Sequence, residues 1–363
     1  MEKMKVGILY GGKSAEHEVS IQSAVNVVQA INKEKYEIVL IGIDRSGRWY
    51  LNNHEDFSNI SQKDMMKFKQ RKREIAVIPG DSSNQLYNVA DNEYLDNIDV
   101  MFPVLHGPYG EDGTIQGLLK SIDLPFVGAG VAGSAVGMDK DIMKRLLRDG
   151  NIPIADYLVY DCKKDIEFNK VKKKLGLPVF IKPANLGSSV GVTKIKNEEE
   201  FSKAVNQAFE FDRKIIVEEF IKGREIECSV IGNKHPKASL PGEIQPEDEF
   251  YSYEAKYIDE SGAVLNIPAK LDVGLIEKVQ ELAVKSFNVL GCEGMARVDF
   301  FIRNNKVLVN EINTIPGFTK ISMYPKLWEN NGISYSSLID KLLDLALKRY
   351  KEEKSLKTRI ELE

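Results

Sequence analysis

The sequence contains few of the residues that define small disulfide-rich or zinc-binding domains. Its 363 residues include 3 cysteines and 4 histidines. Cys162, Cys228 and Cys292 lie far apart, are odd in number and form no C-x-x-C pair. This pattern excludes a disulfide scaffold or a zinc knuckle and is typical of reduced thiols. The scattered histidines form no H-E-x-x-H motif, which excludes that class of zinc hydrolase.

Long apolar runs and an excess of basic charge are also missing. No hydrophobic run approaches the ~20 residues that span a bilayer, and no signal-peptide pattern precedes "VGILY". Lys and Arg number 50 against 54 Asp and Glu, so the net charge of −4 gives no sign of nucleic-acid binding. We expect a cytoplasmic protein of two or three domains that acts on small molecules, not on nucleic acids or membranes.

The first third of the chain alternates strand and helix patterns. The segments "KVGILYGG", "YEIVLIGID" and "IDVMFPVLHG" have the composition of buried strands, and "SIQSAVNVVQAI" repeats apolar residues at helical spacing. This alternation predicts an α/β domain with a doubly wound parallel sheet. The remaining two thirds mix strands and helices less regularly, which predicts an α+β arrangement.

The segment "GILYGGKS" matches the P-loop pattern G-x-x-x-x-G-K-[ST] and raises the possibility of a nucleotide site at Gly12, Lys13 and Ser14. A P-loop requires its first glycine at the end of a strand, so that the following backbone N–H groups can surround phosphates. Here Gly7 lies inside the apolar run, and the three residues after it are typical of a buried strand. We therefore expect the nucleotide to bind elsewhere.

The segment "MARVDFFIRNNKVLVNEIN" predicts a hairpin that carries acidic residues. Residues two apart on a strand share a face, so Arg297 points with Asp299, and Glu311 points with Asn313. An odd number of residues in the turn around Asn304–Asn305 would place both sets on one face, whereas an even number would place them on opposite faces. Together they would form an oxygen cluster suited to Mg²⁺ between nucleotide phosphates. The alternative is an exposed polar sheet face, which the apolar remainder of both strands disfavours.

The segment "NLGSSVGV" (185–192) offers backbone N–H and hydroxyl donors that could fold over phosphates. Lys182, on the strand before it, could reach the phosphate charge as a point cation. Glycine- and serine-rich turns are common, so the prediction depends on the pairing of this segment with the acidic hairpin.

These segments carry a resemblance to the ATP-grasp ligases, and within them to D-alanine–D-alanine ligases. The resemblance covers nearly the whole chain. It rests on these segments, in chain order: "GGKSAEHEVS", "HGPYGEDGTIQG", "MDK", "IKPANLGSSVG", "YSYEAKY", "ARVDFF" and "NEINTIPGFT".

The resemblance implies a fold that binds ATP without a P-loop. It implies an N-terminal α/β domain over 1–127 and two ATP-grasp subdomains over 128–215 and 216–363. A lid at about 245–262 belongs to the last of these. It further implies ATP with two Mg²⁺ or Mn²⁺ ions, and a homodimer, which is usual in the family.

The family's ATP and metal positions fall on named residues of this chain. The metal ligands fall on Asp299, Glu311 and Asn313. The ATP-binding positions fall on Lys140, Lys182, Ser188, Ser189, Glu218, the backbone of Glu219 and Ile221, Glu225 and Lys256.

The family's substrate positions are implied in the same way. Glu16 matches the acid that receives the ammonium of the first D-alanine, with His106 nearby, and Ser188 with Tyr257 matches a bridge from Glu16 to the lid. Arg297 and the Gly317 backbone match the oxyanion stabilisers. Ser322, with Met323 beside it, matches the anchor of the second substrate.

The implied reaction joins two D-alanines through an acyl phosphate to supply the peptidoglycan of the bacterial cell wall. Tyr257 favours the amide product over a D-alanine–D-lactate ester. A P-loop NTPase and a regulatory nucleotide-binding protein without turnover remain alternatives. Two residues also keep simpler interpretations: Arg297 as an ion-pair partner of the hairpin acids, and His106 as a turn histidine satisfied by backbone.

Overall fold

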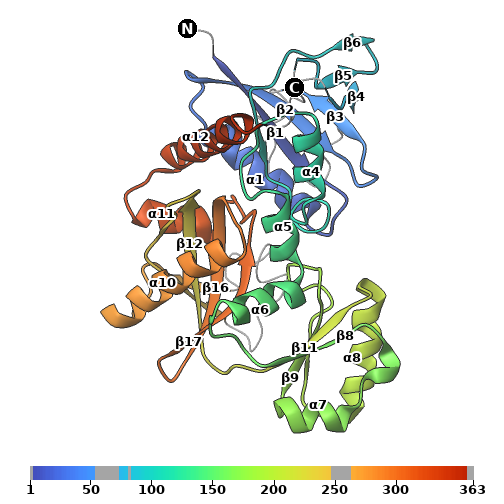
Figure 1. Ribbon diagram of the computed structural model, residues 1–363, viewed down its shortest axis with the longest axis vertical. Helices are drawn as coiled ribbons and strands as arrows, with labels where there is room; N and C mark the ends of the chain where they lie inside the picture. Colours follow the sequence, from blue (N-terminus) through green and yellow to red (C-terminus); the bar gives the residue numbers. More distant parts are fainter. Residues whose placement is uncertain (1–2, 54–72, 81–82, 247–262, 358–363) are drawn as a thin grey trace, which may run out of the picture.

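The described residues form three β-sheets, and the order of these sheets in space differs from their order along the chain (Figure 1). The computed structural model describes residues 3–53, 73–80, 83–246 and 263–357. The N-terminal sheet occupies the top of Figure 1 and the second sheet the bottom. The third sheet, formed by the last strands of the chain, lies between them.

The N-terminal sheet is partly parallel. In spatial order its described strands are β6 (Glu93–Tyr94), β5 (Leu86–Asn88), β4 (Arg73–Val77), β3 (Trp49–Asn52), β2 (Tyr36–Ile43), β1 (Met4–Gly11) and β7 (Val100–Pro103). β1 pairs in parallel with β2 and β7, which confirms the predicted α/β arrangement there. β3 to β6 instead extend the sheet in antiparallel fashion. This extension was not predicted from the sequence.

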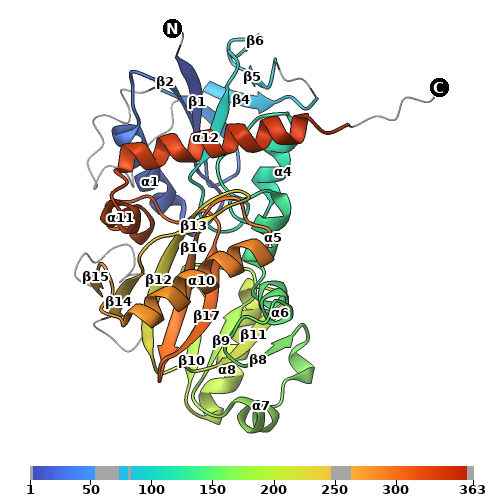
Figure 2. The same ribbon diagram turned by 60° about the vertical axis from the view of Figure 1, so that its left-hand side comes forward.

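Both faces of β1 are buried, which explains its continuous apolar run. Val6, Ile8 and Tyr10 share a core with α1 (His17–Ala30) and α12 (Tyr335–Lys354). Leu9 points the other way and packs with α4 (Thr114–Ser121). Figure 2 shows α12 crossing the N-terminal sheet. The last described helix of the chain therefore completes the core of the first sheet.

The second sheet is antiparallel, in the order β10 (Thr193–Ile195), β9 (Val179–Pro183), β11 (Ile215–Glu219) and β8 (Tyr157–Tyr160). Apolar residues of α7 (Phe168–Leu175) and α8 (Glu198–Phe211) pack against it in a small core of its own. The segment "NLGSSVGV" connects β9 to the edge strand β10.

The third sheet is also antiparallel and carries the predicted acidic hairpin. Its path runs β15 (Ala263–Asn266), β14 (Gly242–Pro246), β12 (Arg224–Gly232), β16 (Gly294–Arg303) and β17 (Lys306–Asn313), with β13 (Lys237–Ala238) paired to β12. Its even-numbered residues on β12 and β16 pack against α10 (Val273–Val289) and α6 (Lys140–Asp149). The opposite face remains available for the site.

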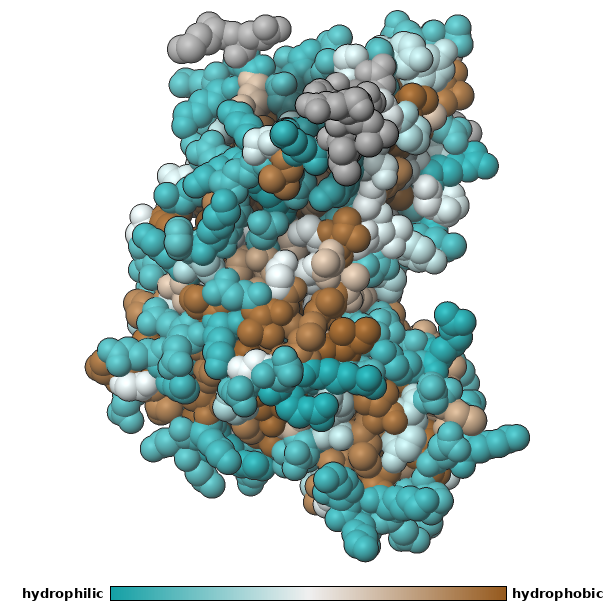
Figure 3. Space-filling model, viewed as in Figure 1, coloured by the Kyte–Doolittle hydropathy of each residue, from teal (hydrophilic) through white to brown (hydrophobic). Residues whose placement is uncertain are grey.

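Hydrophilic residues cover most of the face in Figure 3, and hydrophobic residues gather near its middle. In the described parts of the chain, no helix is both long and apolar enough to cross a membrane. The short helices α5 (Val131–Met138) and α11 (Met323–Asn330) complete the described α-helices. The domain boundaries given above stay predictions.

The core shared by β1 and α12 can be tested at Leu342, whose side chain is fully buried. We expect Leu342→Ala to lower the free energy of unfolding by about 2–5 kcal/mol, because truncating a buried leucine loses apolar burial and leaves a cavity. Urea-induced unfolding measures the change. Leu356→Ala, at a side chain that is 69% exposed, is the control and should change stability by less than about 0.5 kcal/mol. Equal effects of the two substitutions would contradict the packing.

Candidate active site

A cavity of about 370 Å³ lies where the three sheets approach one another. Its walls come from the loops after β1 and β7, from the loop after β9, and from the polar face of the third sheet with the segment after β17. The predicted site residues that line it are Glu16, His106, Ser188, Glu225, Arg297, Asp299, Glu311, Asn313, Gly317, Ser322 and Met323. The structure therefore brings together most of the residues assigned to substrate and metal.

The acidic hairpin reaches one face by a route that the sequence did not predict. Its turn consists of Asn304 and Asn305, an even number, and both residues have positive φ. An even turn alone would place the two acidic sets on opposite faces. A register shift between Asp299 and Phe300 corrects this, because Phe300 pairs with Val309 whereas Asp299 pairs with Glu311. Asn310 is left as the extra residue of a β-bulge, and the bulge aligns the acids.

Arg297 holds this face through two carboxylates. Its Nε and Nη2 donate to Oδ1 and Oδ2 of Asp299, both at 2.7 Å, and Glu227 Oε2 lies 2.9 Å from the same Nε. Asn313 Nδ2 donates to Asp299 Oδ2 at 3.0 Å. Arg297 is thus an ion-pair partner of Asp299, as the simpler interpretation held, and it also lines the cavity.

The donor set of the hairpin fits a magnesium ion that phosphates help to bind. Asp299 and Glu311 supply carboxylate oxygens from directly opposed positions, and Asn313 supplies an amide. Among the described residues, no cluster of three or more His, Cys, Asp or Glu could hold a metal by itself. Mg²⁺ is usually bound through one or two carboxylates together with substrate phosphates. The residues present therefore fit an ion that arrives with a nucleotide.

Glu218 lies buried between two lysines at the side of this site. Its carboxylate forms ion pairs with Lys144 and with Lys182. Burial alone would raise the pKa of Glu218, but the two ammonium groups outweigh burial and hold its pKa below the usual range. Burial lowers the pKa of Lys144, whereas Glu218 and Glu311 hold the pKa of Lys182 above its usual value despite burial. One carboxylate thus keeps two buried cations in place.

Lys140 connects the hairpin to the glycine- and serine-rich loop. Its ammonium donates to the carbonyl of Leu186 at 2.7 Å and lies 3.6 Å from Glu311 Oε2. In that loop Ser188 and Ser189 have positive φ of 50° and 60°. Lys140 therefore spans from the acidic face to the backbone of the predicted phosphate loop.

The structure pairs Glu16 with Ser188 across the cavity. The Ser188 hydroxyl donates to Glu16 Oε1, and Glu16 is buried. Gly107 is required beside them, because its φ is 78° and a Cβ there would lie 2.6 Å from Glu16 Oε2. The predicted partner Tyr257 and the predicted phosphate ligand Lys256 lie outside the described residues.

His106 is buried and uses both ring nitrogens. Nδ1 lies 3.1 Å from the Ile315 carbonyl, which can only accept, and Nε2 lies 3.0 Å from Ser23 Oγ. Ser23 Oγ also accepts from the Phe318 backbone N–H at 3.2 Å. His106 lines the cavity, but its observed contacts fasten the segment that carries Gly317.

The segment after β17 ends at the start of α11. Ser322 Oγ accepts from the Thr319 backbone N–H at 2.9 Å, and a Cβ at Gly317 would lie 2.7 Å from that oxygen. Gly317 therefore lets its backbone approach Ser322 closely. Met323 is buried with Ile244 and Leu327 at this end of the cavity.

Two of the predicted nucleotide-binding residues lie at the end of β11. The Glu219 carboxylate accepts from the Asp156 backbone N–H at 3.0 Å and pairs with Arg303 at 3.6 Å. Ile221 is buried against Ala155 and Leu308. Neither residue lines the cavity described above, so their assignment to ATP stays a prediction.

Comparisons with known proteins identify the family of the chain. The family described as "D-ala D-ala ligase N-terminus" matches residues 5–129, and "D-ala D-ala ligase C-terminus" matches residues 146–344. The D-alanine–D-alanine ligase of Oceanobacillus iheyensis is 53% identical over 361 residues, or 98% of each chain. The chain belongs to the D-alanine–D-alanine ligase family.

Solved structures of this family share the fold. The D-alanine–D-alanine ligase of Coxiella burnetii superposes with a TM-score of 0.87 at 43% identity, covering 98% of this chain and 97% of the other. The Bacillus anthracis ligase, solved in complex with ATP, gives a TM-score of 0.72 at 29% identity, covering 96% and 99%. The predicted family and fold class are confirmed.

The structure of β1 answers the question raised by "GILYGGKS". Gly7 lies inside β1, and Ile8, Leu9 and Tyr10 are fully buried, so they cannot line a phosphate loop. The Lys13 ammonium lies 5.8 Å from the centre of the Tyr109 ring. The P-loop interpretation is wrong.

Sequence reasoning missed two charged residues that the structure adds to the candidate site, Glu227 and Lys144. Glu227 lies on β12 directly opposite Asp299, and strand alternation from Glu225 could have placed it on the same face. Lys144 lies one helical turn after Lys140 on α6, so helical spacing could have identified it. The spacing of each residue along its own strand or helix was visible in the sequence. That spacing became specific only in the structure, where Glu227 faces Asp299 and Lys144 contacts Glu218.

The charge balance around Glu218 predicts unequal effects of removing its members. Glu218→Gln leaves two buried ammonium groups without their shared carboxylate, so we expect a loss of about 3–5 kcal/mol in the free energy of unfolding at pH 7. Lys144→Met leaves a neutral pair of Glu218 and Lys182, and we expect a loss below about 1.5 kcal/mol. Urea unfolding of both variants measures the difference, and the opposite order would contradict it.

The pH dependence of this difference has a defined sign. Because the pKa of Glu218 is lowered in the folded protein, its contribution is fully present above the unfolded pKa of about 4.3 and is lost as pH falls through the folded value. The stability gap between the wild type and Glu218→Gln should therefore shrink only below about pH 4.

Proposed function

We propose that the protein is an ATP-dependent ligase that joins two D-alanine molecules into D-alanyl-D-alanine for peptidoglycan synthesis. The ligase relatives and the ATP complex of one of them support this proposal. The observation that carries it is that Glu16, Arg297 and Ser322 line the same cavity as the acids Asp299 and Glu311.

The first step uses one end of the cavity. Glu16, held by Ser188, receives the ammonium group of the first D-alanine, which leaves its carboxylate to attack the γ-phosphorus of ATP. The bond from that phosphorus to the bridging oxygen breaks, and ADP and an acyl phosphate form. Lys140 and Lys182 offset phosphate charge, which is the main requirement of phosphoryl transfer.

The second step uses the other end of the cavity. The Ser322 hydroxyl receives the carboxylate of the second D-alanine, and its amine attacks the acyl carbon. Arg297 and the Gly317 N–H stabilise the oxyanion of the tetrahedral intermediate. The new C–N bond forms with this intermediate, and the C–O bond to phosphate breaks when the intermediate collapses, with release of phosphate and a proton.

Asp299, Glu311 and Asn313 would hold the Mg²⁺ or Mn²⁺ ions, two of them by the family's pattern. Such ions supply charge neutralisation and orientation for the phosphates when bound. The chain's own contribution is the paired register of the hairpin, together with Arg297, which keeps Asp299 oriented toward the same face.

We further infer a cytoplasmic homodimer divided as predicted from the sequence, with a lid that excludes water from the acyl phosphate. The family resemblance supports these points. The lid at about 245–262 extends from β14 into residues outside the described parts of the chain.

The proposal predicts D-alanine-dependent release of ADP. With ATP, Mg²⁺ and D-alanine we expect ADP and the dipeptide by mass spectrometry, and no turnover with L-alanine. Arg297→Ala should lower kcat by about 10²–10³-fold, because it removes an oxyanion donor. Arg148→Ala, at an exposed arginine on α6, is the matched control and should retain activity.

Two outcomes would change this conclusion. ATP hydrolysis that ignores D-alanine and survives Arg297→Ala would overturn the ligase proposal. A depsipeptide as main product, with D-lactate offered beside D-alanine at neutral pH, would replace the amide by the ester product.

The location of the phosphate site gives a separate test with two lysines. We expect Lys182→Ala to raise the KM for ATP by about 10-fold to 100-fold, because a charge-assisted contact worth about 1.5–3 kcal/mol is lost. Lys13→Ala should leave it unchanged within about twofold. Steady-state kinetics with varied ATP measures both, and the reverse result would contradict the placement of the phosphate site at Lys182.

A further inference from the structure

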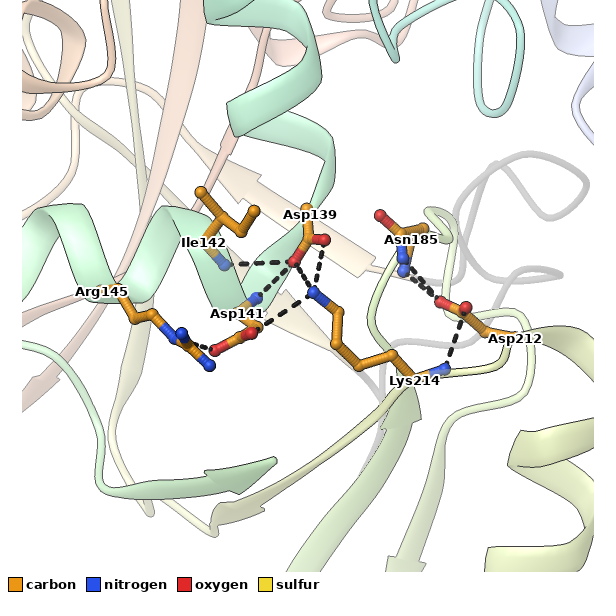
Figure 4. Close-up of polar contacts among 7 residues, drawn as sticks. All are labelled: Asp139, Asp141, Ile142, Arg145, Asn185, Asp212 and Lys214. Carbon is orange, nitrogen blue, oxygen red and sulfur yellow. Dashed lines mark hydrogen bonds and ion pairs between the residues drawn. The ribbon is translucent and has the colours of Figure 1, made fainter. Parts of the chain in front are cut away.

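Three separate chain segments meet at the base of the glycine- and serine-rich loop (Figure 4). They are the start of α6, the end of β9, and the turn between α8 and β11. The Lys140 backbone N–H donates to the Ala184 carbonyl, and the Ala184 N–H donates to the Lys214 carbonyl, both at 3.0 Å. The backbone of these segments is thus joined before any side chain is considered.

The Lys214 side chain fastens the first turn of α6. Its ammonium lies 2.8 Å and 2.5 Å from the two carboxylate oxygens of Asp139 and 3.3 Å from Asp141 Oδ2. Asp139 is the N-cap of α6 and accepts from the backbone N–H groups of Asp141 and Ile142. Burial opposes the charged form of Lys214, but the two aspartates outweigh it and raise the pKa of Lys214.

The other end of the same turn holds the loop. Asp212 Oδ2 accepts from the Asn185 backbone N–H at 2.8 Å and from Asn185 Nδ2 at 2.9 Å. The Lys214 backbone N–H donates to Asp212 Oδ1 at 3.2 Å. Asn185 is followed directly by Leu186, whose carbonyl accepts from Lys140. Residues 212–214 therefore bind both the loop, through Asp212, and the helix that supplies Lys140, through Lys214.

This contact also joins two separately packed bodies. Met143 and Leu147 of α6 lie in the core of the third sheet, whereas β11, which follows Lys214, lies in the core of the second. The ion pair of Lys214 with Asp139 crosses from one body to the other. Figure 4 shows Lys214 between Asp139 and Asp141, with Asp212 and Asn185 beside it.

We propose that Lys214 is a positioning residue for ATP: it fixes Lys140 and the loop 185–192 relative to each other. The proposal rests on the proposed function, which assigns both elements to the ATP phosphates. Lys140 reaches Glu311 and Leu186 together only while α6 keeps its place beside the loop. Misplacement of such groups by about 1 Å can cost up to 10²-fold in activity.

The central test is Lys214→Met, which keeps the length of the side chain and removes its charge. We expect the KM for ATP to rise about 10-fold while the KM for D-alanine stays within about twofold. Lys214→Arg, which keeps the charge, should remain within about threefold of the wild type. Lys203→Met, at an exposed lysine on α8, is the matched control and should change neither constant.

A second variant tests the connection to the loop. Asp212→Ala removes the acceptor of Asn185, and we expect it too to raise the KM for ATP. Because both residues act on one arrangement, the double variant should raise KM no further than the more severe single variant. Full additivity of the two effects would mean that they act independently, which would overturn the proposal.

Calorimetric binding of ATP with Mg²⁺, measured without D-alanine, separates the two proposals. If the wild type binds ATP but releases no ADP with D-alanine, the ligase proposal fails. A larger dissociation constant for ATP in Lys214→Met would still support the positioning role of Lys214. An unchanged constant in that variant, or equal rises in both KM values with a lower melting temperature, would reduce Lys214 to a general structural role. Absence of ATP binding by the wild type would overturn both proposals.

Discussion

The site depends on one electrostatic constraint: two carboxylates face each other on neighbouring strands. Asp299 is paired directly with Glu311, and like charges in opposed positions destabilise a sheet. Arg297 binds the first of these carboxylates, and Lys140 approaches the second. Arg297, on the same strand as Asp299, and Lys140, on α6, therefore offset the repulsion between the two carboxylates.

The same requirement recurs at Glu218, with the signs reversed. There a single carboxylate serves two buried lysines, one on α6 and one on β9. Lys140 and Lys144, which lie one helical turn apart, thus connect α6 to the acidic hairpin and to the second sheet respectively. Charge pairing therefore links the bodies on either side of the proposed nucleotide, beside the apolar contact of Ile221 with Leu308.

The N-terminal sheet contributes to the site by a different means. Its core extends to α12, and its loops carry Glu16 and His106 to the cavity wall. His106 forms hydrogen bonds with Ile315 and Ser23, so a loop of the first sheet holds the segment after β17. The proposed substrate end of the cavity is therefore shaped by close backbone approach, as at Gly107 and Gly317, while the proposed phosphate end is shaped by charge.

Much of the site could be predicted from short segments, because local motifs preserve the order of chemical groups along a strand or loop. Spacing along the strands predicts the acids of the hairpin, and composition with chain position predicts the proposed phosphate loop and Lys182. The apolar run predicts the buried strand at Ile8 to Tyr10. The turn at Asn304–Asn305 shows the limit of that reasoning. Its even length predicts that the acids of the two strands lie on opposite faces, whereas the bulge at Asn310 places them on the same face.

The sequence by itself determined the family, the parallel strands around β1 and the residue types of the site, because these follow from local pattern and from motifs read in order. Tertiary structure alone decided the register of the acidic hairpin, the antiparallel extension of the first sheet and the packing of α12. It also decided the pairing of Lys214 with Asp139. Each of these depends on contacts between segments far apart in the chain, whose energies no local pattern records.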